Sequence, residues 1–249
     1  MVGRLGLFVL ENFNRMKPEL RLIAVLIDLD GTLMDTAPDL AAAVNRMRRD
    51  FGLSALPISR IAAFVGKGAD ILIHRALPDD LNGHLEASLH ARARTLFYHH
   101  YHAVNGSATV VFDRVPEALM MMLDEGLKLA CVTNKPREFT LPLLDRLHLA
   151  SYFSAIVAGD DVQAPKPHPE LLLTACDRLG VATGAALMIG DSSNDVLAAR
   201  AAGMGTVLVE TGYNEGASVA ALRGEPGVKA VLPTLYEAAQ YLTGPGFFV

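Results

Sequence analysis

The apolar positions of the chain fall into two alternating patterns, which together predict an α/β protein. Short apolar runs bounded by turn residues are typical of buried strands, and they occur at 22–27, 127–134, 154–159, 185–191, 205–210 and 229–233. Longer segments repeat their apolar residues with a helical period, and they occur at 116–126, 138–149, 169–180 and 193–203. Because strands and helices alternate, we expect a parallel sheet wrapped by helices.

Residues 37–106 follow a different pattern. They contain helix-like runs, including 39–52 and 85–102, and no clear strand. We therefore predict an all-helical cap domain at 37–106, inserted into a core that is formed by 21–36 and 107–249.

The N-terminal residues 1–20 are predicted to form an extension outside the core. Their apolar run, 5–10, is too short to span a membrane, and no small-residue cleavage site of a signal peptide follows it. We therefore expect a protein that has no membrane partner.

The composition and the charge narrow the class of partner. With 249 residues and 51% hydrophobic side chains, the chain can bury one substantial core. A net charge of -5, without a long run of lysine or arginine, disfavours binding to nucleic acid. We expect the basic residues Arg46, Arg48 and Arg49 on a solvent-facing side of the cap. Both cysteines, Cys131 and Cys176, lie in apolar or helical patterns, so we expect reduced thiols and a cytoplasmic location.

Two carboxylates stand where the first predicted strand ends. Asp28 and Asp30 follow the apolar run and precede a Gly-Thr turn. An Asp-Gly pair is an ordinary turn signal, but two like charges at the exit of a buried strand repel each other unless a cation or a reacting group lies between them. The pattern therefore indicates a metal site or a catalytic site.

The ends of the other predicted strands carry residues that complete such a site. In an open parallel sheet, ligands bind outside the carboxyl ends of the strands. These ends and the loops after them carry Thr133, Asn134, Lys166, Asp191 and Asp195. A hydroxyl, a cation and acidic groups at several separate strand ends favour one shared catalytic site over unrelated turns and helix caps.

This set of residues fits phosphoryl transfer to a carboxylate. We expect Asp28 to be the nucleophile. The side chains of Asp28 and Asp191 and the main-chain carbonyl of Asp30 offer the hard oxygen ligands that suit Mg²⁺. Asp195 is expected as a further metal ligand, directly or through water.

The remaining groups would stabilise and protonate the reacting phosphoryl group. We expect Thr133 and Lys166 to bind its oxygens, and Asn134 to assist in substrate binding. Asp30 is expected to protonate the leaving alkoxide and then to activate the water that hydrolyses the aspartyl phosphate.

These residues occur in four motifs, which are DLDGT at 28–32, VTN at 132–134, APKPHP at 164–169 and GDSSND at 190–195. In this order the motifs resemble those of the haloacid dehalogenase-like superfamily, and the resemblance covers the chain from about residue 21 onward. It implies a helical cap that closes over a Rossmann-like core, Mg²⁺ as cofactor and a small phosphomonoester as substrate. Within that superfamily, an aspartate at position 30 favours a phosphatase or a phosphomutase over a dehalogenase.

Further segments resemble the phosphoglycolate phosphatase subfamily, namely FVGKGADILIHRAL at 64–77, KPHPELL at 166–172 and GYN at 212–214. This likeness implies 2-phosphoglycolate as the substrate. The first segment places Lys67 between two glycines, which permit close backbone approach. We therefore expect Lys67 to reach the site and to bind the substrate carboxylate.

Several alternatives stay open on the sequence alone. The substrate could be another small phosphate ester, such as a sugar phosphate. A phospho-accepting receiver also combines an aspartate, Mg²⁺, a threonine and a lysine, but it needs neither Asp30 as a water activator nor a cap of this size. A non-catalytic binding protein on this fold would lack at least one catalytic residue, and none is missing. A monomer and a homodimer are both compatible with the sequence.

Overall fold

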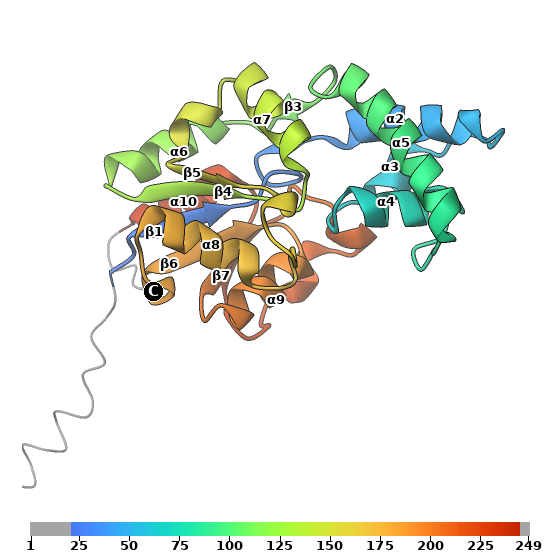
Figure 1. The fold of residues 1–249 in the computed structure, drawn as a ribbon. Coiled ribbons are helices and arrows are strands. Elements are labelled where there is room, and N and C mark those ends of the chain that lie inside the picture. Colours follow the sequence, from blue (N-terminus) through green and yellow to red (C-terminus); the bar gives the residue numbers. More distant parts are fainter. Residues whose placement is uncertain (1–20, 245–249) are drawn as a thin grey trace, which may run out of the picture.

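A six-stranded parallel sheet forms the centre of the computed structural model, which describes residues 21–244 (Figure 1). Its strands lie in the order β5-β4-β1-β6-β7-β8. Their bounds are β1 Ala24–Ile27, β4 Lys128–Val132, β5 Ala155–Val157, β6 Ala186–Gly190, β7 Gly205–Val209 and β8 Val228–Leu232. The α/β fold expected from the sequence is confirmed. The predicted extension at 1–20 lies outside the described residues.

Alternate residues of the central strand pack into two different cores. Val25 and Ile27 of β1 belong to the apolar cluster on one face of the sheet, and Ala24 and Leu26 belong to the cluster on the other face. All four side chains are fully buried, as expected for a strand of a parallel sheet that is covered on both faces. The continuous apolar run that marked this strand in the sequence reflects this double burial.

Helices cover both faces of the sheet (Figure 1). The first face packs against α6 Val115–Asp124, α7 Arg137–Arg146 and α10 Leu235–Thr243. The second face packs against α8 Glu170–Leu179 and α9 Ser193–Ala201. Every helix predicted after residue 108 is therefore present, and α8 ends at Gly180 in the left-handed conformation that favours glycine.

Four helices form a separate layer beside the carboxyl ends of the strands (Figure 1). They are α2 Ala37–Asp50, α3 Ile58–Ala62, α4 Ala69–Ala76 and α5 Ala87–Val104, and they share an apolar cluster of their own. We call this layer the cap. Phe139 at the start of α7 joins the cap cluster, so the cap also packs on the core.

Two short antiparallel strands carry the chain into and out of the cap. They are β2 Met34–Asp35 and β3 Val110–Val111. The sequence did not reveal them, because two residues are too few to show a period of hydrophobicity. The division into a cap at 37–106 and a core at 21–36 and 107–249 stays a prediction.

The expected solvent-facing position of Arg48 was wrong. Its side chain is buried, and its guanidinium donates hydrogen bonds to the carbonyl oxygens of Ser54 and Leu77. Leu77 follows the last turn of α4, where carbonyl oxygens lack partners within the helix. Arg48 therefore ties α2 to the end of α4, a role that its charge pattern could not indicate.

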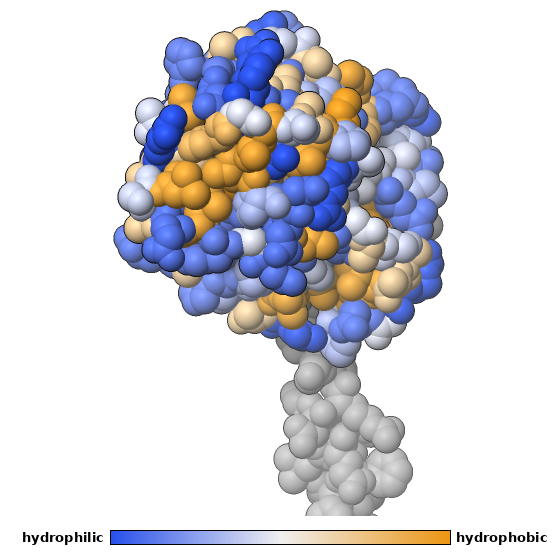
Figure 2. All heavy atoms as spheres, turned by 90° about the vertical axis from the view of Figure 1, so that its right-hand side faces the viewer, coloured by the Kyte–Doolittle hydropathy of each residue, from blue (hydrophilic) through white to orange (hydrophobic). Residues whose placement is uncertain are grey.

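The cap end of the molecule shows apolar side chains at its surface (Figure 2). Large hydrophobic residues of the cap that are exposed include Leu53, Ile58, Ile71, Leu81 and Leu89. Within residues 21–244, no helix has the length and apolar character needed to cross a membrane.

Candidate active site

The predicted site residues converge at one edge of the sheet. Asp28 follows β1 directly, and β1 lies between β4 and β6. Thr133 follows β4, and Asp191 follows β6. The chain moves outward in one direction from β1 to β4 and β5 and in the other direction through β6, β7 and β8, so the site lies at a topological switch point, where parallel sheets bind ligands.

Three buried carboxylates form the centre of the site. One oxygen each of Asp28, Asp191 and Asp195 lies within 4.8 Å of the others. The ammonium of Lys166 lies 2.8 Å from both Asp28 Oδ1 and Asp195 Oδ1. One positive charge against three ionised carboxylates leaves an excess of negative charge, and a buried excess of this kind fits a divalent cation held by oxygen ligands.

Burial also raises the pKa values of two of these carboxyls. Burial raises the pKa of Asp28 to about 7, although Lys166 opposes this effect. Burial, followed by the charges of Asp28 and Asp195, raises the pKa of Asp191 well above its ordinary value. A cation between them would favour the ionised forms of both groups. The three carboxylates could therefore hold a metal ion.

Lys166 and Asp195 hold each other in place. Lys166 Nζ also donates to the carbonyl oxygen of Val132, so three acceptors surround this ammonium. Asp195 Oδ2 accepts hydrogen bonds from the amide and the hydroxyl of Ser192, which begin α9 with a capping box. The predicted metal contact of Asp195 and the predicted phosphoryl contact of Lys166 stay predictions.

Asp191 is fixed by two elements that approach it closely. Its carboxylate accepts a hydrogen bond from the hydroxyl of Thr32 and another from the amide of Tyr213. A Cβ atom at Gly212 would lie 1.8 Å from Asp191 Oδ2, and one at Gly31 would lie 2.7 Å from the same oxygen. Gly31 also has a φ of +90°, which L side chains rarely adopt. Both glycines are therefore required by the position of this carboxylate.

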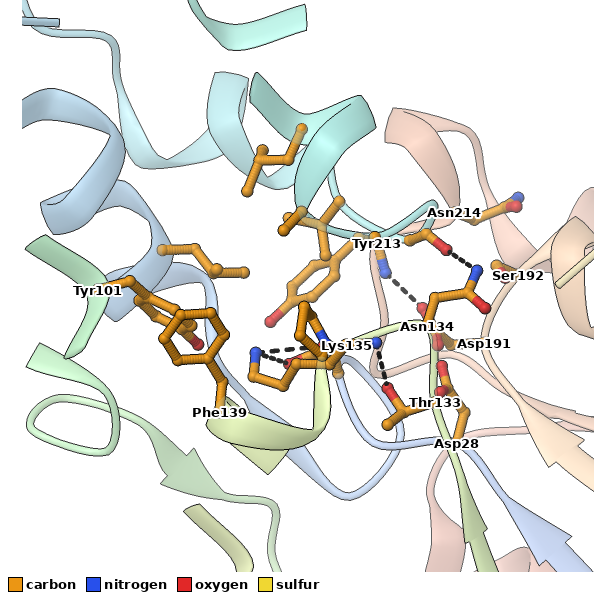
Figure 3. Close-up of a pocket in the computed structure, with 18 of the residues that line it drawn as sticks. Asp28, Tyr101, Thr133, Asn134, Lys135, Phe139, Asp191, Ser192, Tyr213 and Asn214 are labelled. Carbon is orange, nitrogen blue, oxygen red and sulfur yellow. Dashed lines mark hydrogen bonds and ion pairs between the residues drawn. The ribbon is translucent and has the colours of Figure 1, made fainter. Parts of the chain in front are cut away.

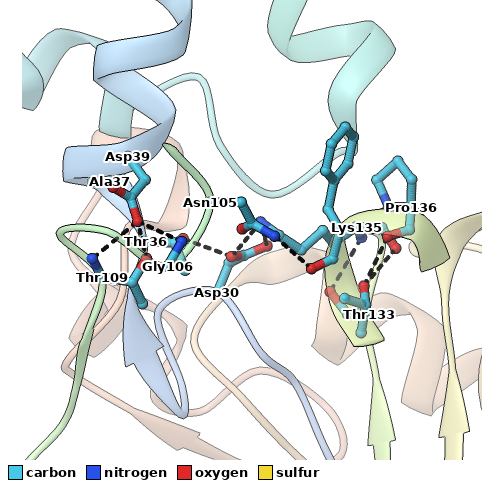
Figure 4. A network of polar contacts seen from close by, with 12 residues as sticks. Asp30, Thr36, Ala37, Asp39, Asn105, Gly106, Thr109, Thr133, Lys135 and Pro136 are labelled. Atoms are coloured by element: carbon cyan, nitrogen blue, oxygen red, sulfur yellow. Dashed lines mark hydrogen bonds and ion pairs between the residues drawn. The ribbon is translucent and has the colours of Figure 1, made fainter. Parts of the chain in front are cut away.

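Asp30 lies outside the carboxylate cluster and faces the entrance to the cap (Figure 4). Its Oδ1 atom accepts a hydrogen bond of 2.6 Å from the Thr36 hydroxyl and one of 3.0 Å from the Lys135 ammonium. Lys135 is buried, and its ammonium lies 4.9 Å from the centre of the Tyr101 ring. Two donors therefore orient the carboxylate that was predicted to act as acid and base.

Thr133 and Asn134 lie next to each other but have different surroundings. Thr133 lines a pocket, and its hydroxyl accepts a hydrogen bond from the amide of Lys135. The side-chain amide of Asn134 donates to the carbonyl oxygens of Gly66 in the cap and of Lys166. Asn134 therefore connects the cap to the core, and its predicted contact with substrate stays a prediction.

The pocket lies between the cap and the strand ends and has a volume of about 40 Å³ (Figure 3). Asp28, Asp30 and Asp191 line its core side, and apolar side chains including Leu40, Leu72, Phe97 and Phe139 line its cap side. Among the described residues of the lining, Lys135 has the only positively charged side chain. The pocket is therefore small and apolar at the end away from the carboxylates.

Lys67, the predicted reader of the substrate carboxylate, is not among the residues that line this pocket. Its ammonium lies 2.9 Å from Glu215 Oε1, and the guanidinium of Arg75 lies 2.7 Å from the same oxygen. Its role in substrate binding stays a prediction.

Sequence reasoning gave no role to three residues that the structure places at the site, Lys135, Thr36 and Tyr213. The position of Lys135 directly after Thr133 and Asn134, at the end of a strand, was the available signal. Tyr213 was marked only as part of the GYN segment. Its contact could not be read locally, because its hydroxyl reaches Asp35 at the entrance to the cap, 178 residues away in the chain.

Comparisons with known proteins agree with this architecture. Residues 25–209 match the family model described as haloacid dehalogenase-like hydrolase. The chain is 43% identical over 219 residues to a phosphoglycolate phosphatase of Nitrosospira multiformis, covering 88% of this chain and 95% of the relative. It is 39% identical over 214 residues to a phosphoglycolate phosphatase of Escherichia coli K12, covering 78% of this chain and 84% of the relative.

A solved structure has the same fold. The crystal structure of a predicted phosphoglycolate phosphatase from Haemophilus somnus superposes with a TM-score of 0.79 at 27% sequence identity, covering 91% of this chain and 99% of that one. The family match, the curated relatives and the fold lead to the same conclusion. The chain belongs to the haloacid dehalogenase-like hydrolases.

Proposed function

We propose that this protein is a Mg²⁺-dependent phosphomonoester hydrolase that acts through an aspartyl phosphate on Asp28, with 2-phosphoglycolate as its preferred substrate. One observation carries the proposal. A buried cluster of three carboxylates that includes Asp28 lies at the strand ends, and Asp30 lies outside this cluster with its own hydrogen bonds from Thr36 and Lys135. This arrangement supplies a nucleophile and a proton donor two residues apart.

In the first step, Asp28 would attack the phosphorus atom and displace the alkoxide of the substrate. When bound by Asp28, Asp191 and the Asp30 main chain, Mg²⁺ would reduce the repulsion between the anionic nucleophile and the anionic phosphate. Lys166, 2.8 Å from Asp28, fixes the orientation of the nucleophile and balances part of its charge. The hydroxyl of Thr133 would donate to a phosphoryl oxygen.

Asp30 would transfer the protons of both steps. It would first protonate the bridging oxygen, so that the product leaves as an alcohol, and would then take a proton from the water that hydrolyses the aspartyl phosphate. The hydrogen bonds from Thr36 and Lys135 hold this carboxyl toward the pocket. The buried pocket limits the access of other water molecules during the reaction.

Two observations support a small substrate. The relatives named above are phosphoglycolate phosphatases, and they align with most of this chain. Large apolar side chains, including Leu72, Phe97 and Phe139, bound the pocket on the side away from the carboxylates, which favours a short leaving group. Phosphoglycolate carries only one methylene between its bridging oxygen and its carboxylate, so it suits a pocket of this kind better than a nucleotide does.

A panel of phosphomonoesters would test the proposal. We expect Mg²⁺-dependent release of phosphate, with phosphoglycolate preferred over sugar phosphates and nucleotides, and no activity in excess EDTA. Asp28→Asn should show no measurable turnover, because the amide cannot form the aspartyl phosphate. Ser54→Ala, a change at an exposed position of the cap, is a suitable control. Full activity of Asp28→Asn or of the enzyme in EDTA would overturn the mechanism, and a different preferred ester would overturn the substrate.

We also place this activity in the cytoplasm. Cys131 and Cys176 are both free and buried. Unpaired buried cysteines are usual in a reducing compartment, which supports the placement.

A further inference from the structure

A buried hydroxyl group in the wall of the pocket donates no hydrogen bond. Tyr101 of α5 is 1% exposed and lines the pocket, and its Oη–H reaches no acceptor among the described residues. Its neighbour Lys135 carries an ammonium, which can only donate. Buried polar groups almost always have a partner, because an unpaired one has lost its hydrogen bonds to water. Figure 3 shows Tyr101 at the cap end of the pocket, facing Lys135. The hydroxyl therefore points to a ligand that supplies an acceptor.

Lys135, the only positively charged residue among the described residues that line the pocket, lies next to this hydroxyl. The Lys135 ammonium lies 4.9 Å from the centre of the Tyr101 ring, and both side chains are almost completely buried. Burial raises the pKa of Tyr101 to about 12, so the hydroxyl keeps its proton at neutral pH and can donate it in a hydrogen bond. A hydroxyl donor and an ammonium in an apolar wall suit an anionic acceptor.

The position of this pair relative to the reacting atoms sets the size of the ligand. Lys135 Nζ is 3.0 Å from Asp30 Oδ1, and under the proposed function Asp30 protonates the bridging oxygen of the substrate. An anionic group bound by Lys135 must therefore lie within a few bonds of that oxygen. The carboxylate of phosphoglycolate meets this condition, since a single methylene separates it from the bridging oxygen.

We propose that the Tyr101 hydroxyl and the Lys135 ammonium form the subsite that binds the second anionic group of the substrate, a carboxylate one carbon from the bridging oxygen. This inference rests on the proposed function and deepens it. It assigns substrate selection to a residue of the cap, Tyr101, together with a residue of the core, Lys135. The subsite is therefore complete only while the cap packs on the core.

Lys67 is the competing candidate for this role. It is already paired with Glu215, which also accepts from Arg75, and it lies outside the pocket lining. Lys135 is likewise paired with a carboxylate, that of Asp30, but it lines the pocket and can therefore contact a ligand there without leaving Asp30.

Tyr101→Phe tests the subsite with the smallest possible change, because it removes the hydroxyl and keeps the ring beside Lys135. We expect kcat/KM for phosphoglycolate to fall about tenfold or more, the effect of losing one hydrogen bond to a charged group, while kcat/KM for ethyl phosphate stays the same. Tyr98→Phe is the matched control on the same helix, since the Tyr98 hydroxyl accepts from Arg94 outside the pocket lining. Tyr98→Phe should leave kcat/KM unchanged for both substrates.

A direct binding measurement separates recognition from catalysis. In the non-reacting Asp28→Asn protein with Mg²⁺, calorimetry should show weaker binding of phosphoglycolate when Tyr101→Phe is added and unchanged binding of ethyl phosphate. The melting temperature of the Tyr101→Phe protein should equal or exceed that of the wild type, because an unpaired buried hydroxyl is removed.

Distinct results identify which proposal fails. In one outcome, the wild type hydrolyses phosphomonoesters while Tyr101→Phe lowers kcat/KM equally for phosphoglycolate and ethyl phosphate, or for neither. In that case the subsite is wrong and the proposed function stands. If Lys67→Ala lowers kcat/KM for phosphoglycolate alone and Tyr101→Phe does not, the substrate carboxylate is bound by Lys67. A wild type without phosphatase activity would remove the proposed function itself.

Discussion

At the scale of single residues, two aspartates that stand two positions apart have unlike surroundings. Asp28 lies with two other carboxylates and is paired with Lys166. Asp30 points away from them and accepts hydrogen bonds from Thr36 and Lys135. The tight turn after β1 produces this difference, because it carries the chain from the sheet toward the cap within a few residues. Such unlike environments fit the different catalytic roles that we propose for the two carboxyls.

The separate role of Asp30 can be measured. Asp30→Asn should lower kcat by about 10²–10⁴-fold, the usual contribution of a positioned acid or base, because the amide cannot transfer a proton. Its affinity for Mg²⁺ should change little, since its side chain lies outside the carboxylate cluster. Calorimetric titration with Mg²⁺ checks this expectation. A large loss of Mg²⁺ affinity would show that the Asp30 side chain is a metal ligand.

At the scale of elements, one buried carboxylate connects the segment that enters the cap with the segment that leaves it (Figure 4). Asp39, in the first turn of α2, accepts hydrogen bonds from the amides of Gly106, Ala108 and Thr109 and from the Thr109 hydroxyl. These three residues belong to the segment that leaves the cap after α5. The carboxylate therefore fixes where the cap begins relative to where it ends.

Removal of this carboxylate should destabilise the protein. Asp39→Ala leaves several buried donors without an acceptor, so we expect the free energy of unfolding to fall by roughly 3 kcal/mol. Asp50→Ala, at the other end of α2, is the matched control, because the Asp50 carboxylate pairs with His100 at the surface and such pairs contribute at most about 1 kcal/mol. Denaturant titration of both variants measures the difference. Equal losses in the two proteins would contradict the prediction.

At the scale of the whole molecule, the carboxylate cluster links stability to pH and to metal binding. The pKa of Asp28 is raised to about 7, mainly by burial, and the pKa of Asp191 is raised for the same reason. A carboxyl with a raised pKa binds its proton more tightly in the folded state than in the unfolded chain. Its contribution to stability is therefore present below the ordinary pKa of 3.8 and is lost as the pH rises toward about 7.

This linkage predicts how Mg²⁺ changes the melting temperature. Without metal, ionisation of the cluster should cost stability as the pH rises from about 5 to about 8. Under the proposed function the ionised carboxylates would bind Mg²⁺, so the gain in melting temperature on adding Mg²⁺ should be larger at about pH 8 than at about pH 5. Thermal unfolding with and without Mg²⁺ measures the gain, and Asp28→Asn should reduce it. The same gain at both pH values would contradict the prediction.

The sequence alone determined the sheet, the order of its helices and the edge at which the polar residues meet. Apolar runs and helical periods depend on neighbouring residues, so they can be read locally. The carboxyl ends of parallel strands share one edge, and for this reason Asp28, Thr133 and Asp191 could be placed together before the structure was known. Two-residue strands such as β2 and β3 were missed because they are too short to show a period.

Only the tertiary structure decided which lysine faces the pocket. Lys135 follows the VTN motif and Lys67 lies between two glycines of the cap, and local sequence does not show which of them reaches the pocket. The packing of the cap on the core places Lys67 against Glu215, 148 residues later in the chain, and leaves Lys135 beside Asp30 and Tyr101. Ion pairs between distant segments depend on the three-dimensional path of the chain rather than on its pattern. The sequence therefore indicates the edge of the sheet at which the polar residues meet, and the contact between the cap and the core determines which side chains surround the pocket.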